Sequence, residues 1–185
     1  PGLSGPEAVE PSFSSPSWLA DGAAALQAVV SHLEQGPFAD RVAAYQVAAG
    51  LENRWLSWDL EGDAYGDYSE PQRQAFQRWL RDRYGDLPAL RGAWGQPVQP
   101  SKEPNSAPAV MNWSQIRVPA TADRSASEGW VLDPSARRPV VDYRLFASQA
   151  IAGCLDHFAG AVKTAAQDRK VCGAAYGHFM ELAGR

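Results

Sequence analysis

A chain of 185 residues is long enough for one domain with a hydrophobic core and too short for most two-domain plans. Apolar residues make up 45% of the chain and charged residues 21%, which excludes a protein that is disordered throughout. The formal net charge of -4 leaves no basic excess, so we expect no nucleic-acid partner.

Several classes of site have no support in the sequence. The apolar runs are interrupted within about ten residues, short of the roughly 20 that a membrane helix needs, so we expect no membrane partner. Cys154 and Cys172 stand in apolar stretches, as small buried residues do, and the histidines lack metal-ligand spacing. No Gly-rich phosphate loop and no G-x-S-x-G motif occurs. We therefore expect no metal and no other cofactor, and a cytoplasmic location.

The chain opens with an irregular lead-in, a helix and a strand. Residues 1–15 are rich in Pro and Ser, and the start at Pro1 without a signal-peptide pattern is typical of a cut or processed end. Ser15 followed by a proline marks a helix start. A helix is predicted over 16–35 from apolar residues at every third or fourth position: Leu19, Ala23, Leu26, Val30 and Leu33. Residues 41–49 alternate Val and Tyr with small apolar residues, which predicts a parallel strand buried on both faces.

A loop and a well-marked helix come next. Residues 50–68 are dense in aromatic and acidic side chains and show no clean period, so we interpret them as a long loop. Ser69 is suited to cap a helix, and Gln72 stands at the position of a capping-box partner. Apolar residues at helical spacing follow, which predicts a helix over 70–84.

The remaining elements are a short helix, a long excursion, a long helix and a strand. Asp86 is suited to cap a short helix that ends by Gly95. Residues 96–138 lack periodicity and predict a long excursion loop, with scattered apolar anchors at Trp113, Ile116, Val118, Trp130 and Leu132. A long helix is predicted over 139–167 with a core stripe of Ala147, Ile151, Leu155, Phe158 and Val162. Residues 170–177 repeat the pattern of the first strand and predict a second buried strand.

This alternation of helices and strands predicts an α/β fold in which helices cover parallel strands. A closed eight-stranded β/α barrel needs about 250 residues, and only two strands are evident here. We therefore expect residues 1–185 to form a single partial (β/α)8 TIM-barrel-like domain.

Candidate catalytic residues follow the two predicted strands, because parallel strands bind ligands at their carboxyl ends. Glu52 comes directly after the first strand and Glu181 after the second, and two carboxylates are the minimum for glycoside hydrolysis. Tyr176 and His178 also follow the second strand, and His178 could hydrogen-bond a substrate hydroxyl. The alternatives are that Glu52 forms a salt bridge with Arg54 in a solvated loop and that Glu181 starts a helix.

Aromatic residues gather in the loop after the first strand: Trp55, Trp58, Tyr65 and Tyr68. Flat aromatic faces suit the apolar faces of sugar rings, so the loop could form a sugar platform. Equally, these side chains could pin the loop to the domain. The acidic residues of the same loop lack the regular spacing of a calcium site, and we expect no metal there.

Four segments in order resemble the catalytic barrel of bacterial β-galactosidase-like proteins of glycoside hydrolase family 42. These segments are residues 15–58, 67–95, 140–163 and 170–182, and the resemblance covers roughly residues 12–183. It implies a retaining glycosidase of the β/α-barrel clan, acting on β-galactosides or related oligosaccharides, in which the first strand here is the fourth of eight. The acid/base glutamate then follows that strand, and the nucleophile glutamate lies beyond Arg185. The intact protein could form a homo-oligomer.

One motif departs from the family pattern. Many relatives have G-x-T-G-E-W after the fourth strand, where this chain has Gly50-Leu51-Glu52-Asn53-Arg54-Trp55. Arg54 therefore takes the glutamate position, and Glu52 is displaced by two residues.

Two main hypotheses follow from this departure. In the first, Glu52 is the acid/base of a retaining β-galactosidase, and the isolated chain is inactive for lack of a nucleophile. In the second, the protein is a non-catalytic relative that binds carbohydrate. Under either hypothesis the expected substrate-binding residues are Asn53, Arg54, Trp55, Trp58, Tyr176, His178 and Glu181. A third interpretation is a barrel fragment whose open strand edges make it associate.

Overall fold

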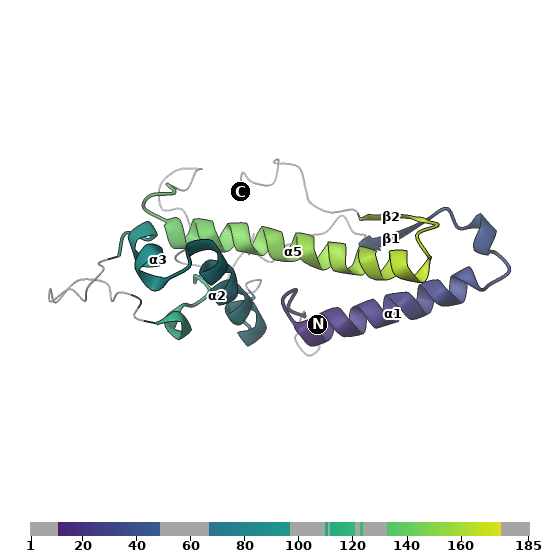
Figure 1. The fold of residues 1–185 in the computed structure, drawn as a ribbon, viewed down its shortest axis with the longest axis horizontal. Coiled ribbons are helices and arrows are strands. Elements are labelled where there is room, and N and C mark those ends of the chain that lie inside the picture. Colours follow the sequence, from purple (N-terminus) through teal and green to yellow (C-terminus); the bar gives the residue numbers. More distant parts are fainter. Residues whose placement is uncertain are drawn as a thin grey trace, which may run out of the picture.

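The computed structural model describes residues 11–48, 67–96, 110, 112–120, 123 and 133–174. In chain order, the helices and strands are α1 (Pro16–Glu34), η1 (Ala39–Arg41), β1 (Ala44–Ala48), α2 (Glu70–Tyr84), α3 (Leu87–Ala93), η4 (Trp113–Gln115), α5 (Arg138–Ala165) and β2 (Val171–Ala174). The long helix α5 runs through the middle of the molecule (Figure 1). Helix α1 and the two strands pack on its carboxyl-terminal half, and α2 and α3 lie at its amino-terminal end.

The helix starts follow from local capping. Ser15 Oγ accepts a hydrogen bond from the Trp18 N–H at the start of α1. Ser69 does the same for Gln72 in α2, and Asp86 caps α3. These caps confirm the predicted starts of the three helices. Each start could be predicted because its cap needs only a side chain and a backbone amide three residues away.

The predicted capping box of α2 is wrong in one detail. The Gln72 side chain does not return to the cap but enters the core, where it is 1% exposed. Its Nε2 donates to the hydroxyl of Tyr143 at 3.2 Å, and its Oε1 accepts a hydrogen bond from Ser14. A buried partner on α5 therefore takes precedence over the local cap.

Strands β1 and β2 pair in parallel, as the alternation of elements predicts. The register places Ala44 opposite Val171 and Ala48 opposite Ala174. The connection between the strands contains α2, α3, η4 and α5, and its last helix, α5, runs beside the strands in the opposite direction, as in a βαβ unit (Figure 1). Among the described residues these are the only two strands, so the parallel α/β arrangement is present without a barrel.

The prediction that both strands are buried on both faces is wrong for the described residues. Only Ala48 is fully buried in β1, and Val171 in β2 is 67% exposed. A strand is buried on both faces only when helices and further strands surround it, and here each strand has one described neighbour. Cys172 on β2 is half-buried for the same reason, whereas Cys154 on α5 is buried as predicted.

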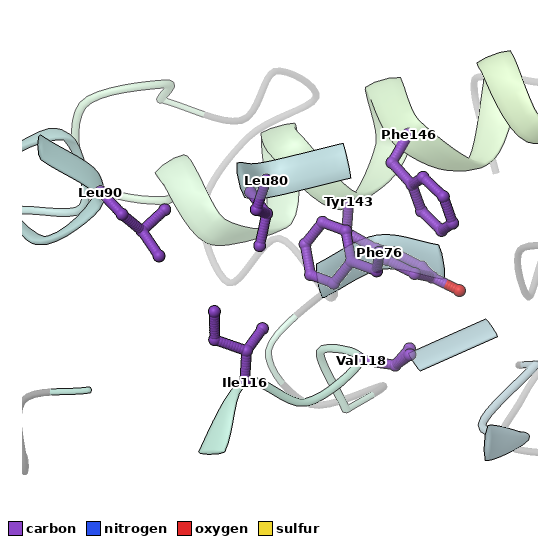
Figure 2. Close-up of a cluster of buried hydrophobic side chains, with 7 residues drawn as sticks. All are labelled: Phe76, Leu80, Leu90, Ile116, Val118, Tyr143 and Phe146. Carbon is purple, nitrogen blue, oxygen red and sulfur yellow. The ribbon is translucent and has the colours of Figure 1, made fainter. Parts of the chain in front are cut away.

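Helix α5 has two distinct apolar contact regions. At its amino-terminal end, α2, α3 and the segment 116–118 enclose a cluster that we call the aromatic core (Figure 2). Its buried members are Phe76, Leu80, Leu90, Ile116, Val118, Tyr143 and Phe146. Burial of Ile116 and Val118 confirms two of the anchors expected in the excursion, while Trp130 and Leu132 lie outside the described residues.

The second region, which we call the sheet-side core, lies where α1 and the strands meet the other half of α5. It consists of two small clusters whose buried members are Val30, Val162, Ala166, Ala48, Ile151 and Leu155. The five-residue core stripe predicted for α5 is confirmed, since every member is buried. The stripe predicted for α1 is confirmed only in part, because Val30 is buried but Leu33 is 42% exposed.

By length and composition alone, α5 could cross a membrane, although the mean hydropathy of its most apolar window is only 1.2. Of its most apolar window, 44% is buried inside the protein. Contacts with α1, α2 and both strands account for this apolar surface, as in the core helix of a globular domain.

Candidate functional site

The described part of the candidate site is the sheet edge at which β1 and β2 end. Ala48 and Ala174, the last residues of the two strands, are register partners. Ala48 is buried beside Ile151 and Leu155 of α5, so this edge is fixed to the helix. The carboxyl ends of two parallel strands therefore lie side by side on a firm base.

All of the residues predicted for the site lie outside the described residues. The set is Glu52, Asn53, Arg54, Trp55, Trp58, Tyr176, His178 and Glu181. Residues 50–66 of the predicted loop 50–68 lie outside them too. What the structure does bring together is the starting point of both segments: Glu52 is four residues beyond Ala48, and His178 is four residues beyond Ala174.

A buried carboxylate lies farther along α5, at the junction with α2 and α3. Asp142 is 0% exposed, and its Oδ2 accepts hydrogen bonds from the Tyr84 hydroxyl at 2.6 Å and the Trp94 indole N–H at 2.9 Å. Its Oδ1 accepts one from Arg138 Nε at 3.0 Å, and Arg83 lies 3.7 Å from the same oxygen. These five residues form what we call the Asp142 cluster.

Hydrogen bonds and charges within the Asp142 cluster shift the pKa values of two of its members. Burial, together with the hydrogen bond to Asp142, raises the pKa of Tyr84, so the phenol remains a neutral donor. The pKa of the Arg138 guanidinium is raised by its hydrogen bond with Tyr84 and by the charge of Asp142. A carboxylate that accepts this many hydrogen bonds holds three elements together and positions the Trp94 ring.

Sequence reasoning missed Asp142. The available signal was an acidic residue inside the apolar run at the start of α5, four residues after Arg138. That spacing places the two side chains on one helix face. Nothing in the sequence shows, however, that Tyr84 and Trp94 reach the same carboxylate from two other elements.

A cavity of about 570 Å³ opens beside this cluster. It lies between the end of α3, the segment 117–119 and the start of α5. Trp94 of the Asp142 cluster is one of its lining residues, and Arg117 and Arg137 are others. Its volume falls within the range of about 300–1,000 Å³ that is typical of small-molecule sites.

No group of three or more His, Cys, Asp or Glu side chains within the described ranges could hold a metal ion. Of the acidic loop residues considered above, only Asp67 falls within those ranges, where it accepts a hydrogen bond from Ser69 N–H at 3.0 Å. Its role there is to shape the entry to α2.

Comparison with known families gives one match. Residues 53–182 match the sequence model of glycoside hydrolase family 42, described as beta-galactosidase. The matched segment includes α2, α3, α5 and β2, and it covers well over half of the chain. It begins one residue after Glu52 and contains the other seven predicted site residues.

Proposed function

The chain belongs to glycoside hydrolase family 42, the β-galactosidase family, and from this premise we propose that it contributes the acid/base side of a retaining β-galactosidase site. Family members have a TIM barrel, and barrel enzymes carry their active sites at the carboxyl ends of the strands. The observation that carries the proposal is the pairing of Ala48 with Ala174, since the segments after β1 and β2 then leave the same sheet edge.

In the proposed mechanism, Glu52 is the acid/base. It protonates the glycosidic oxygen as the leaving group departs, and afterwards removes a proton from the water that attacks the glycosyl-enzyme intermediate. The nucleophile is a second carboxylate supplied by the later part of the barrel. The 185-residue chain therefore binds galactosides but does not hydrolyse them.

The other site residues have binding roles in this proposal. Trp55 and Trp58 provide flat faces for the sugar ring, while Asn53 and Arg54 bond its hydroxyls. Tyr176, His178 and Glu181 approach the same sugar from the segment after β2. The substrate class is β-galactosides or related oligosaccharides.

A carbohydrate-binding relative without catalysis is the second candidate. Arg54 occupies the position at which relatives carry the glutamate, and that substitution favours this alternative. The two candidates differ in the pKa expected for Glu52. An acid/base needs a raised pKa, whereas a solvated or Arg-paired carboxylate has an ordinary or lowered one.

Two measurements test the proposal on the 185-residue chain. Calorimetric titration with lactose should give saturable binding that Trp55→Ala abolishes and the exposed control Asp156→Asn leaves unchanged; absence of binding contradicts both candidates. NMR titration of the Glu52 carboxyl carbon should then give a pKa raised above that of an ordinary glutamate. An ordinary or lowered pKa would favour the non-catalytic relative.

A further inference from the structure

The cavity beside the Asp142 cluster has features of a ligand site that the strand ends do not account for. It is lined by an aromatic residue, Trp94, and by apolar residues that include Pro119 and Val140. Polar side chains from three segments line the rest: Gln96, Arg117, Asp123 and Arg137. Small-molecule sites combine apolar walls with a few converging polar groups in this way.

Trp94 is held in place before any ligand arrives. Its indole N–H donates to the fully buried Asp142, which Tyr84 and Arg138 also bond. A ring fixed in this manner loses little conformational entropy when a ligand packs against it. Asp142 therefore serves as a positioning residue for the cavity wall.

The polar groups of the cavity include both donors and acceptors. Arg117 is exposed, and its positive charge contributes to the lowered pKa of Glu70 on α2. Arg137 donates to the backbone carbonyl of Asp123 at 2.9 Å, and the Asp123 carboxylate accepts the Ala120 N–H at 3.0 Å. The Gln96 side-chain oxygen accepts the Val110 N–H at 3.0 Å.

This mixture selects against a simple anion. A phosphate or sulfate would meet the Asp123 carboxylate as well as the two arginines, and like charges repel. Sugar hydroxyls both donate and accept, so they can use guanidinium and carboxylate groups together. With an aromatic wall beside them, these groups suit a neutral carbohydrate.

The cavity also lies in the direction in which a long substrate would extend. Val140 lines the cavity, and Ile151 contacts Ala48 at the end of β1. Val140 and Ile151 are eleven positions apart on α5, or about 16 Å at the rise of an α-helix. Because α5 runs opposite to the strands (Figure 1), the cavity lies beyond their carboxyl ends and not behind the sheet.

We propose that this cavity is a distal sugar-binding site, which takes a neutral sugar unit of a β-linked oligosaccharide whose terminal galactose occupies the strand-end site. The inference rests on the proposed function for the nature of its ligand. It adds a second point of contact that favours oligosaccharides over disaccharides.

The test uses the 185-residue chain and NMR detection of the tryptophan indole N–H groups, with Trp94→Phe to assign the Trp94 signal. Lactose and a β-1,4-linked galactotetraose are the probes. The tetraose should shift the Trp94 signal saturably and bind more tightly than lactose. Arg117→Ala should weaken tetraose binding by about tenfold, as loss of a charged hydrogen-bond donor does. Arg78→Ala, an exposed arginine of α2 away from the cavity, is the matched control and should change nothing.

The outcomes separate the two proposals. If either sugar shifts Trp55 while the tetraose leaves Trp94 unchanged, or if Arg117→Ala binds the tetraose normally, the distal site is wrong and the proposed function survives. If the tetraose shifts Trp94 in an Arg117-dependent manner while Trp55 responds to neither sugar, the distal site stands and the strand-end proposal fails.

Discussion

The two ends of α5 pack in different ways. At the amino-terminal end, the aromatic core is enclosed by α2, α3 and the segment 116–118, and four of its seven members are 0% exposed. At the other end, the sheet-side core has only small clusters, and Val29 and Val171 beside them are more than half exposed.

The difference reflects how each region is built. Helices of the aromatic core satisfy their backbone groups internally and need only side-chain contacts, which three neighbouring elements supply. A two-stranded parallel sheet leaves unpaired backbone groups along both edges and is normally covered on two faces. The sheet-side region therefore exposes apolar side chains and strand edges of the kind that neighbouring strands and helices cover in a larger sheet. This is consistent with the barrel of the family to which the chain belongs.

The largest expected effect is in the aromatic core. Phe76 is 0% exposed and contacts the rings of Tyr143 and Phe146 at 5.3 Å between centroids. Phe76→Ala should lower the free energy of unfolding by about 3–5 kcal/mol, measured by urea denaturation. The control Phe38→Ala removes a ring that is 64% exposed and should cost little. Equal losses in the two variants would show that the aromatic core is not the main source of stability.

Asp142→Asn should have the next largest effect. It removes the charge that pairs with Arg138, but Arg138 and Arg83 keep 30% and 39% of their side chains exposed. Water therefore compensates part of the loss, and we expect about 2 kcal/mol, less than for a fully buried pair. Urea denaturation measures it against Asp156→Asn, an exposed carboxylate on the same helix. A neutral result would mean that Asp142 does not hold α2, α3 and α5 together.

The close approach of α1 to α5 provides a smaller perturbation on the sheet side. A Cβ added at Gly22 would lie 2.8 Å from the Phe158 ring, which also contacts Trp18. Gly22→Ala should therefore destabilise by about 1 kcal/mol, because overpacking exceeds the gain in helix propensity. Gly153→Ala on α5 meets nothing within 4 Å and should stabilise slightly. Stabilisation by both substitutions would show that the α1 contact is loose.

How much the sequence predicts depends on the range of the interaction. The starts of α1, α2 and α3 could be predicted because Ser15, Ser69 and Asp86 act within one turn. The parallel pairing followed from the alternation of helices and strands. The exposure of β1 and β2 could not be predicted, since it depends on how many neighbours the strands have.

For the strand-end site, the sequence predicts residue types and the structure contributes the shared sheet edge. Asp142 was missed because its partners come from distant segments.

The smallest expected effect is confined to alkaline pH. Tyr45 of β1 donates to Glu34 Oε1 at 2.7 Å, and burial together with this acidic partner raises its pKa to about 12. Below pH 10 the phenol is protonated in both folded and unfolded chains; as the pH rises toward 12, only the unfolded chain loses the proton, so stability falls. Tyr45→Phe should remove that part of the fall, measured by urea denaturation at pH 9 and pH 11. An unchanged pH dependence would mean that Tyr45 is solvated.

The central claim is that the segments after β1 and β2 form one galactoside site because their strands end side by side. Its most direct test is an NMR titration of the 185-residue chain with lactose that follows the Trp55 indole and the His178 backbone amide in the same sample. The account predicts that both signals shift along one binding curve with a single Kd, and that Trp113 in η4 does not respond. A shift in one segment alone, or separate curves for the two, would contradict it.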